Sequence, residues 1–162
     1  MRRHRSRLAN LPVRIAAGSF ILNAGIGKLG ATEETAGAVH GMAVGTYPFL
    51  EGLPPSRFVK ALGASEVALG AALLFPAVGD GMAGLSLAAF AGGLLGLYVK
   101  TPGLRDEGSL RPTQQGTAIA KDVWLLGIGL SLMADSVRSS RRRAKKARRV
   151  ATRAQAGVGT TE

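Results

Sequence analysis

Five polar residues interrupt the apolar stretches of this 162-residue chain, and they are the residues best able to do chemistry. They are Asn23, Lys28, Glu66, Lys121 and Asp122. Charges in apolar surroundings usually pair with one another or line a polar cavity. The cluster therefore either holds helices in register or binds a lipid headgroup, a quinone ring or a proton. We favour the structural role slightly, because an ion pair needs no ligand, and Glu66 is central to both.

Most other site chemistry is missing from the sequence. The chain has no cysteine, which excludes a disulfide, a thiolate nucleophile and cysteine-bound metals. His4 and His40 have no second histidine or carboxylate at ligand spacing, so we predict no metal site. We find no nucleophile elbow, phosphate-binding loop or catalytic carboxylate pair. We therefore assign no catalytic residue and lean towards a protein that is not an enzyme.

The elements that position these residues are long apolar runs. Residues 81–99 carry no charge, and as a helix they would cover about 28 Å, close to the thickness of the hydrocarbon core of a bilayer. We predict an all-α fold, an integral membrane four-helix bundle. Its transmembrane helices are expected at about 11–29, 58–78, 81–99 and 117–135.

The fourth helix is the least certain from its length, because its uncharged part, 123–134, would reach only about 18 Å. Either it is not a span, or residues 117–122 also lie in the membrane, with Trp124 as an interfacial anchor. We adopt the second interpretation. Gly92 and Gly96 share a helix face and permit a close crossing, although ordinary glycine enrichment explains them equally well.

The connections between the runs differ in character. Residues 30–57 are expected to form a loop whose apolar middle rests at the interface. Residues 78–81 (Val-Gly-Asp-Gly) predict a tight turn that joins the second and third runs as an antiparallel hairpin.

The basic residues gather at both ends of the chain, which carries a net charge of +11. Because basic segments stay in the cytoplasm, we predict cytoplasmic tails at 1–10 and 136–162, the second without regular structure, around a transmembrane domain at 11–135. Both tails share one side only if the number of spans is even. This orientation places the five polar residues in the outer half of the bundle.

The cytoplasmic basic residues are expected to contact anionic lipid headgroups. Nucleic acid is a weaker alternative, because no aromatic or globular reader accompanies the basic run. The predicted lipid contacts are Arg14, Arg138, Arg141, Arg142, Arg143, Lys145 and Lys146.

Two motifs suggest a family. Residues 25–29 (Gly-Ile-Gly-Lys-Leu) resemble the "G-x-x-K-L" ending of the first helix in the DoxX-like family of small four-helix bacterial membrane proteins. Residues 62–70 are similar to its "G-x-x-E-x-x-x-G" segment. The resemblance covers about 14–135 and leaves the basic C-terminal tail outside.

The resemblance implies a multi-pass protein of the bacterial inner membrane in which Lys28 and Glu66 are the recurrent polar pair. It also implies a non-catalytic subunit or scaffold of a redox or oxidative-stress complex, with quinone as the only cofactor suggested. Two alternatives stay open: a small-molecule carrier that acts as a homo-oligomer, and a quinone-interacting subunit of a membrane oxidoreductase.

Overall fold

The computed structural model describes residues 2–158, and side chains from Ala9 to Arg149. No strand occurs within residues 2–158, so the all-α class is confirmed there. The elements are α1 (Arg2–Leu29), α2 (Glu33–Thr46), a short 3-10 helix η1 (Pro48–Leu50), α3 (Pro55–Leu74), α4 (Asp80–Lys100), α5 (Thr117–Ala120) and α6 (Val123–Val158).

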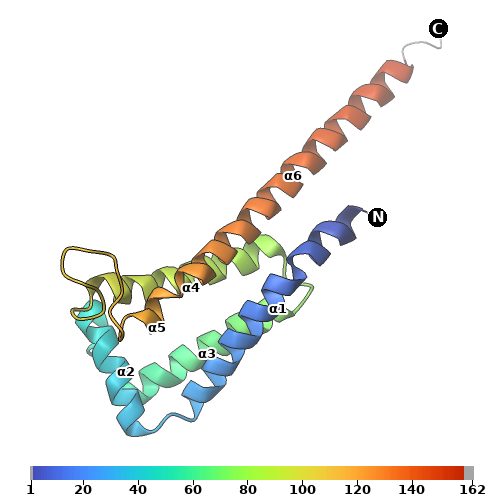
Figure 1. Ribbon diagram of the computed structural model, residues 1–162. Coiled ribbons are helices and arrows are strands. Elements are labelled where there is room, and N and C mark those ends of the chain that lie inside the picture. Colours follow the sequence, from blue (N-terminus) through green and yellow to red (C-terminus); the bar gives the residue numbers. More distant parts are fainter. Residues whose placement is uncertain (1, 159–162) are drawn as a thin grey trace.

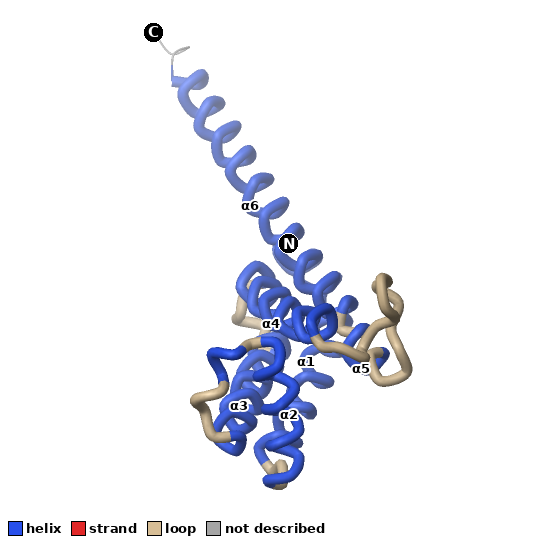
Figure 2. The backbone as a smooth tube through the Cα atoms, turned by 90° about the vertical axis from the view of Figure 1, so that its left-hand side faces the viewer, coloured by secondary structure: helices blue, strands red, loops and turns tan. Residues whose placement is uncertain are grey.

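The four long helices form two antiparallel pairs. α1 packs along α3, and α4 packs along α6. The pairs meet near the turn between α3 and α4 and diverge from there, with α2 at the far end (Figure 1). Figure 2 shows the same helices from the side, with α6 extending well beyond the rest. α3 and α4 are thus joined by a short turn, but each packs mainly on another helix, so they do not form the predicted hairpin.

Glycines bring α1 and α3 together. Gly25 lies opposite Gly63, and a Cβ added at Gly25 would lie only 2.7 Å from the Gly63 carbonyl oxygen. Seven residues away on both helices, a Cβ at Gly70 would lie 2.8 Å from the carbonyl oxygen of Gly18. Close backbone contact of this kind is how helices associate where no bulky core drives them together.

Glycines also allow α4 and α6 to approach each other closely. A Cβ at Gly84 would lie 2.6 Å from the Gly129 carbonyl oxygen, so α4 and α6 cross closely there. The close crossing considered for Gly92 and Gly96 is wrong: Gly92 faces open space, and Gly96 lies against the Tyr47 side chain.

A core of small and aliphatic side chains connects the two pairs. It includes residues from each of the long helices: Ala17, Ile21, Leu69, Leu73, Ala83, Leu87, Ala91, Leu125 and Leu132. Outside this core much of the surface is apolar, as at Phe20, Phe75 and Trp124, which are 54%, 61% and 73% exposed.

The prediction of a loop over 30–57 is wrong, because most of this segment is helical. α2 begins after Thr32, whose Oγ1 accepts a hydrogen bond from the Thr35 backbone N–H at 3.3 Å. Glu33 and Glu34 occupy its first turn, where the helix dipole favours acidic groups. Ala36 and Ala43 are buried on its inner face.

Within the part of the chain that the structure describes, two segments are long and apolar enough to cross a membrane. They are α4, Asp80–Lys100, and the segment Thr117–Arg149 that includes α5 and most of α6. The C-terminal basic segment was expected to lack regular structure, but α6 remains helical to Val158. Residues 159–162 lie outside the described residues.

Candidate functional site

Glu66 and Lys28 form an ion pair between α3 and α1. The Lys28 Nζ donates to Glu66 Oε2 at 2.8 Å. Glu66 is only 4% exposed, whereas the Lys28 side chain is 28% exposed. The two residues, placed in one polar cluster from the sequence, pair directly in the structure.

The helix register explains this pair. Lys28 follows Gly25 by three residues on α1, and Glu66 follows Gly63 by three residues on α3. The Cβ atoms of Lys28 and Glu66 each lie against the glycine of the other helix. The glycine contact therefore brings the lysine stem close enough for its ammonium group to reach the carboxylate.

Two further members of the predicted cluster lie near this pair. Asp122, which immediately precedes α6, is half-buried and interacts electrostatically with Lys121, Glu66 and Lys28. The Lys121 Nζ lies 5.5 Å from the centre of the Phe20 ring, a cation–π arrangement between the end of α5 and α1. Asn23 is exposed and makes no hydrogen bond to the described residues, so the structure does not bring it into the cluster.

The cluster is closely packed where the Glu66 Cβ lies against Gly25. A shallow apolar groove of about 520 Å³ exists elsewhere, lined by α1 and the end of α3, and no member of the cluster lines it. Glu66 Oε1 has no hydrogen-bond partner among the described residues, so one carboxylate oxygen stays available for a further donor. The arrangement can hold the two helices together and can accept one additional hydrogen bond.

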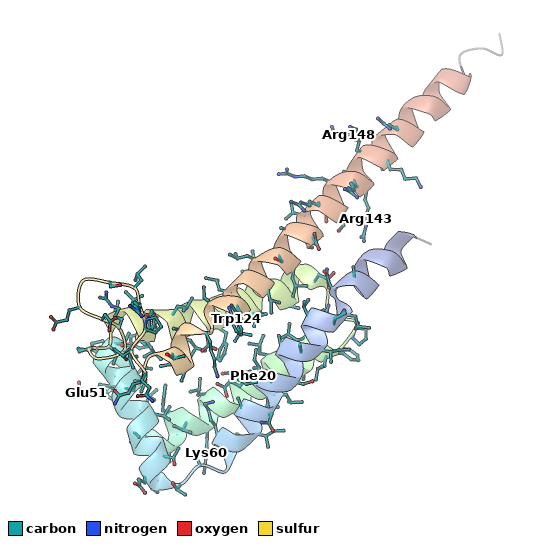
Figure 3. All side chains as sticks on the ribbon, in the orientation of Figure 1. Phe20, Glu51, Lys60, Trp124, Arg143 and Arg148 are labelled. Atoms are coloured by element: carbon teal, nitrogen blue, oxygen red, sulfur yellow. The ribbon has the colours of Figure 1, made fainter. Side chains whose placement is uncertain are left out.

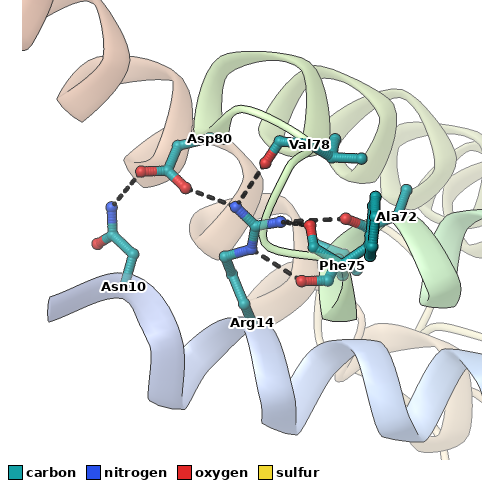
Figure 4. Close-up of polar contacts among 7 residues, drawn as sticks. Asn10, Arg14, Ala72, Phe75, Val78 and Asp80 are labelled. Carbon is teal, nitrogen blue, oxygen red and sulfur yellow. Dashed lines mark hydrogen bonds and ion pairs between the residues drawn. The ribbon is translucent and has the colours of Figure 1, made fainter. Parts of the chain in front are cut away.

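A second polar centre lies at the opposite end of the helices, around Arg14 (Figure 4). The Arg14 guanidinium donates to Asp80 Oδ1 at 2.7 Å and to four backbone carbonyl oxygens at 2.8–3.1 Å. Asn10 donates to the other oxygen of Asp80 at 3.2 Å. The four carbonyls belong to Ala72, Leu73, Phe75 and Val78, at the end of α3 and in the turn that follows.

The prediction that Arg14 contacts lipid phosphate is wrong. It is 5% exposed, and its donors are directed to the protein. Carbonyls at a helix C-terminus have no partner within the helix and favour a cation. Arg14 therefore closes the end of α3 and joins it to the start of α4. A sequence signal existed, because Arg14 precedes the buried Ala17 and Ile21 by three and seven residues on one helix face.

The remaining predicted lipid contacts lie on the exposed outer part of α6. Figure 3 shows Arg143 and Arg148 on the portion of α6 that projects beyond the other helices. Asp135 lies 4.0 Å from Arg138 at the base of this projection. The exposed predicted contacts are Arg138, Arg141, Arg142, Arg143, Lys145 and Lys146.

No protein-family model, curated protein or solved structure matches this chain. The resemblance to the DoxX-like family therefore stays a prediction from the two short motifs.

Proposed function

We propose that this protein is an integral membrane subunit without catalysis of its own, and that it holds a partner protein in the bilayer. The observation that carries the proposal is the apolar surface of its helices. Only 28% of the most apolar part of α4 is buried, and only 11% of the most apolar part of the segment Thr117–Arg149. A core helix of a water-soluble protein with this composition would be mostly buried, because exposed apolar area costs about 25 cal/mol per Å² in water.

The same argument supports α1 and α3 as additional spans. Their charged residues make them less apolar than α4, yet Arg14 pairs with Asp80 and Lys28 pairs with Glu66. Pairing lowers the cost of placing a charge in lipid. Their outer surfaces carry apolar side chains such as Ile15 and Ile26, which are 48% and 57% exposed.

Four passes agree with the placing of the two ends of the chain. The start of α1 and the end of α6 leave the same end of the molecule (Figure 1). Both carry dense basic sequence, which favours the cytoplasmic side. We therefore propose that the Arg14 centre lies near the cytoplasmic face and the Glu66 cluster near the outer face of a bacterial inner membrane.

We propose a subunit without catalysis of its own because both polar centres are used to hold the helices together. The buried charged side chains of Arg14 and Glu66 pair within the bundle, and no catalytic arrangement accompanies them among the described side chains. A redox or oxidative-stress complex is the partner class that the DoxX-like resemblance suggests.

The test is purification of the full chain in mild detergent, followed by identification of co-purifying proteins at stoichiometric amounts. We expect a stoichiometric membrane-associated partner. A chain that purifies alone under several mild detergents would contradict the proposal.

Glu66 Oε1 favours one second candidate, a small-substrate carrier, because it leaves an acceptor in the polar cluster. In this case Glu66→Gln would abolish flux into vesicles while the variant remains folded. Flux unchanged by Glu66→Gln would exclude this role for the cluster.

A further inference from the structure

The projecting part of α6 extends too far to serve only lipid headgroups. Asp135 is the first charged residue after the apolar part of the helix, and Arg149 follows it by 14 residues. At about 1.5 Å per residue, Arg149 lies roughly 21 Å along the axis from Asp135. The headgroup layer is only about 5–8 Å thick on each side. Most of this helix therefore stands in water if α6 leaves the membrane near its normal.

One face of α6 has a regular pattern that continues from the membrane part into the projection. Val123, Leu130 and Val137 follow one another at seven-residue intervals and are 51%, 52% and 51% exposed. Ala144 is the next residue in this series and is also exposed. The buried residues of α6, such as Leu132, pack towards α4 and do not belong to this series.

In the projection the pattern becomes a coiled-coil seam. Ser140 and Ala147 lie three residues after Val137 and Ala144, which gives the alternating spacing of three and four that pairs helices. The sequence continues the spacing at positions 151, 154 and 158. Small side chains along the seam allow a second helix to approach closely.

The charges beside the seam determine which helix can bind. At 100° per residue, Arg141 and Arg148 flank the seam on one side and Arg143 flanks it on the other. Arg142 and Arg149 lie on the opposite face. Flanking positions of a coiled coil pair with oppositely charged residues of the partner. Two copies of this chain aligned on the seam would oppose arginine to arginine. The charge pattern therefore excludes a second copy and favours an acidic helix.

We propose that the face of α6 formed by Val137, Ser140, Ala144 and Ala147 is the docking site for an acidic amphipathic helix of another protein. This inference rests on the proposed function and gives the chemistry of the partner. The partner helix carries small or aliphatic residues on one stripe and glutamate or aspartate beside it.

The test uses the full chain in nanodiscs of phosphatidylcholine, which carries no net charge. The probe is a synthetic helical peptide with alanine and leucine at its seam positions and glutamate at both flanking positions. Fluorescence anisotropy of the labelled peptide gives the Kd. The double variant Arg141→Glu/Arg143→Glu reverses one flanking charge on each side of the seam, and Arg142→Glu/Arg149→Glu is the matched control with the same change in net charge on the opposite face.

We expect the flanking variant to weaken binding at least tenfold and the control to weaken it less than about threefold. We also expect Ala147→Glu, within the seam, to weaken binding at least tenfold. Equal losses in the two double variants would overturn the proposal, since general charge attraction would then explain binding. The proposal would also fail if the wild-type chain bound vesicles of anionic phosphatidylglycerol but not the peptide, or if a cysteine placed at Ala144 cross-linked two copies.

Washing the same preparations with alkaline carbonate distinguishes a failure of the docking site from a failure of the proposed membrane function. A chain that stays in the membrane but ignores the peptide overturns only the docking site. A chain released by carbonate overturns the proposed membrane function.

Discussion

The glycine contact between α1 and α3 yields the sharpest prediction, because one helix offers both the perturbation and its control. In Gly25→Ala the new Cβ would lie 2.7 Å from the Gly63 carbonyl oxygen and from the Val67 backbone nitrogen. Both are backbone atoms that cannot rotate away, so the helices must separate. Gly27→Ala makes the same chemical change two residues later, where nothing lies within 4 Å.

The magnitude follows from comparing the two variants. Replacing glycine by alanine inside a helix gains about 1 kcal/mol of helix propensity at either position. Overpacking a close contact costs about 1–3 kcal/mol. The propensity gain cancels in the comparison, so Gly25→Ala should be less stable than Gly27→Ala by about 1–3 kcal/mol.

The assay is unfolding of the full chain in mild detergent by titration with sodium dodecyl sulfate, followed by circular dichroism. Separation of α1 from α3 should also break the ion pair between Lys28 and Glu66, so we expect Gly25→Ala to respond less to Glu66→Gln than the wild type does. If Gly25→Ala equals or exceeds Gly27→Ala in stability, the close packing of the two helices is refuted.

Three further predictions use the same unfolding assay. Arg14→Leu should cost about 3–5 kcal/mol, because it leaves Asp80 with only the Asn10 hydrogen bond and removes the cation from the carbonyl groups at the end of α3; a loss below 1 kcal/mol would contradict the role of this centre. Lys28→Met should destabilise the chain by leaving Glu66 buried and unpaired, and adding Glu66→Gln should restore part of the loss; no restoration would show that the pair is not coupled. Thr32→Ala should cost about 0.5–2 kcal/mol by removing the cap of α2, with faster proteolysis near α2 as the local readout, and unchanged proteolysis would argue against the cap.

The sequence predicted the long helices and the grouping of Glu66 with Lys28 in one polar cluster, because both depend on patterns that are local or periodic. The long apolar runs indicate where the four long helices lie, but α1 begins at Arg2 and α6 continues to Val158, well outside the predicted 11–29 and 117–135. Lys28 and Glu66 lie on two adjacent helices, which limits the charges that can meet. The glycine pairing was also visible in principle, since Gly18 and Gly25 repeat the seven-residue spacing of Gly63 and Gly70.

Three features were not predicted: α2, the partners of Arg14 and the helix in the C-terminal segment. The periodicity of apolar residues does not indicate any of them. α2 has no sustained apolar run, and its start is marked only by Thr32 before two glutamates. The partners of Arg14 are mostly carbonyl groups at the end of α3, and these carry no residue identity. Basic composition concealed the helix in the C-terminal segment, because like charges in a row suggest a solvated tail.

The central claim is that the chain crosses the membrane an even number of times with both ends in the cytoplasm. Because the chain has no cysteine, single cysteines report position without background. We predict that a membrane-impermeant maleimide applied to intact cells labels Gln115→Cys in the connector between α4 and α5, and that it labels Ala9→Cys and Arg149→Cys only after the cells are opened. Labelling of either end in intact cells would contradict the account.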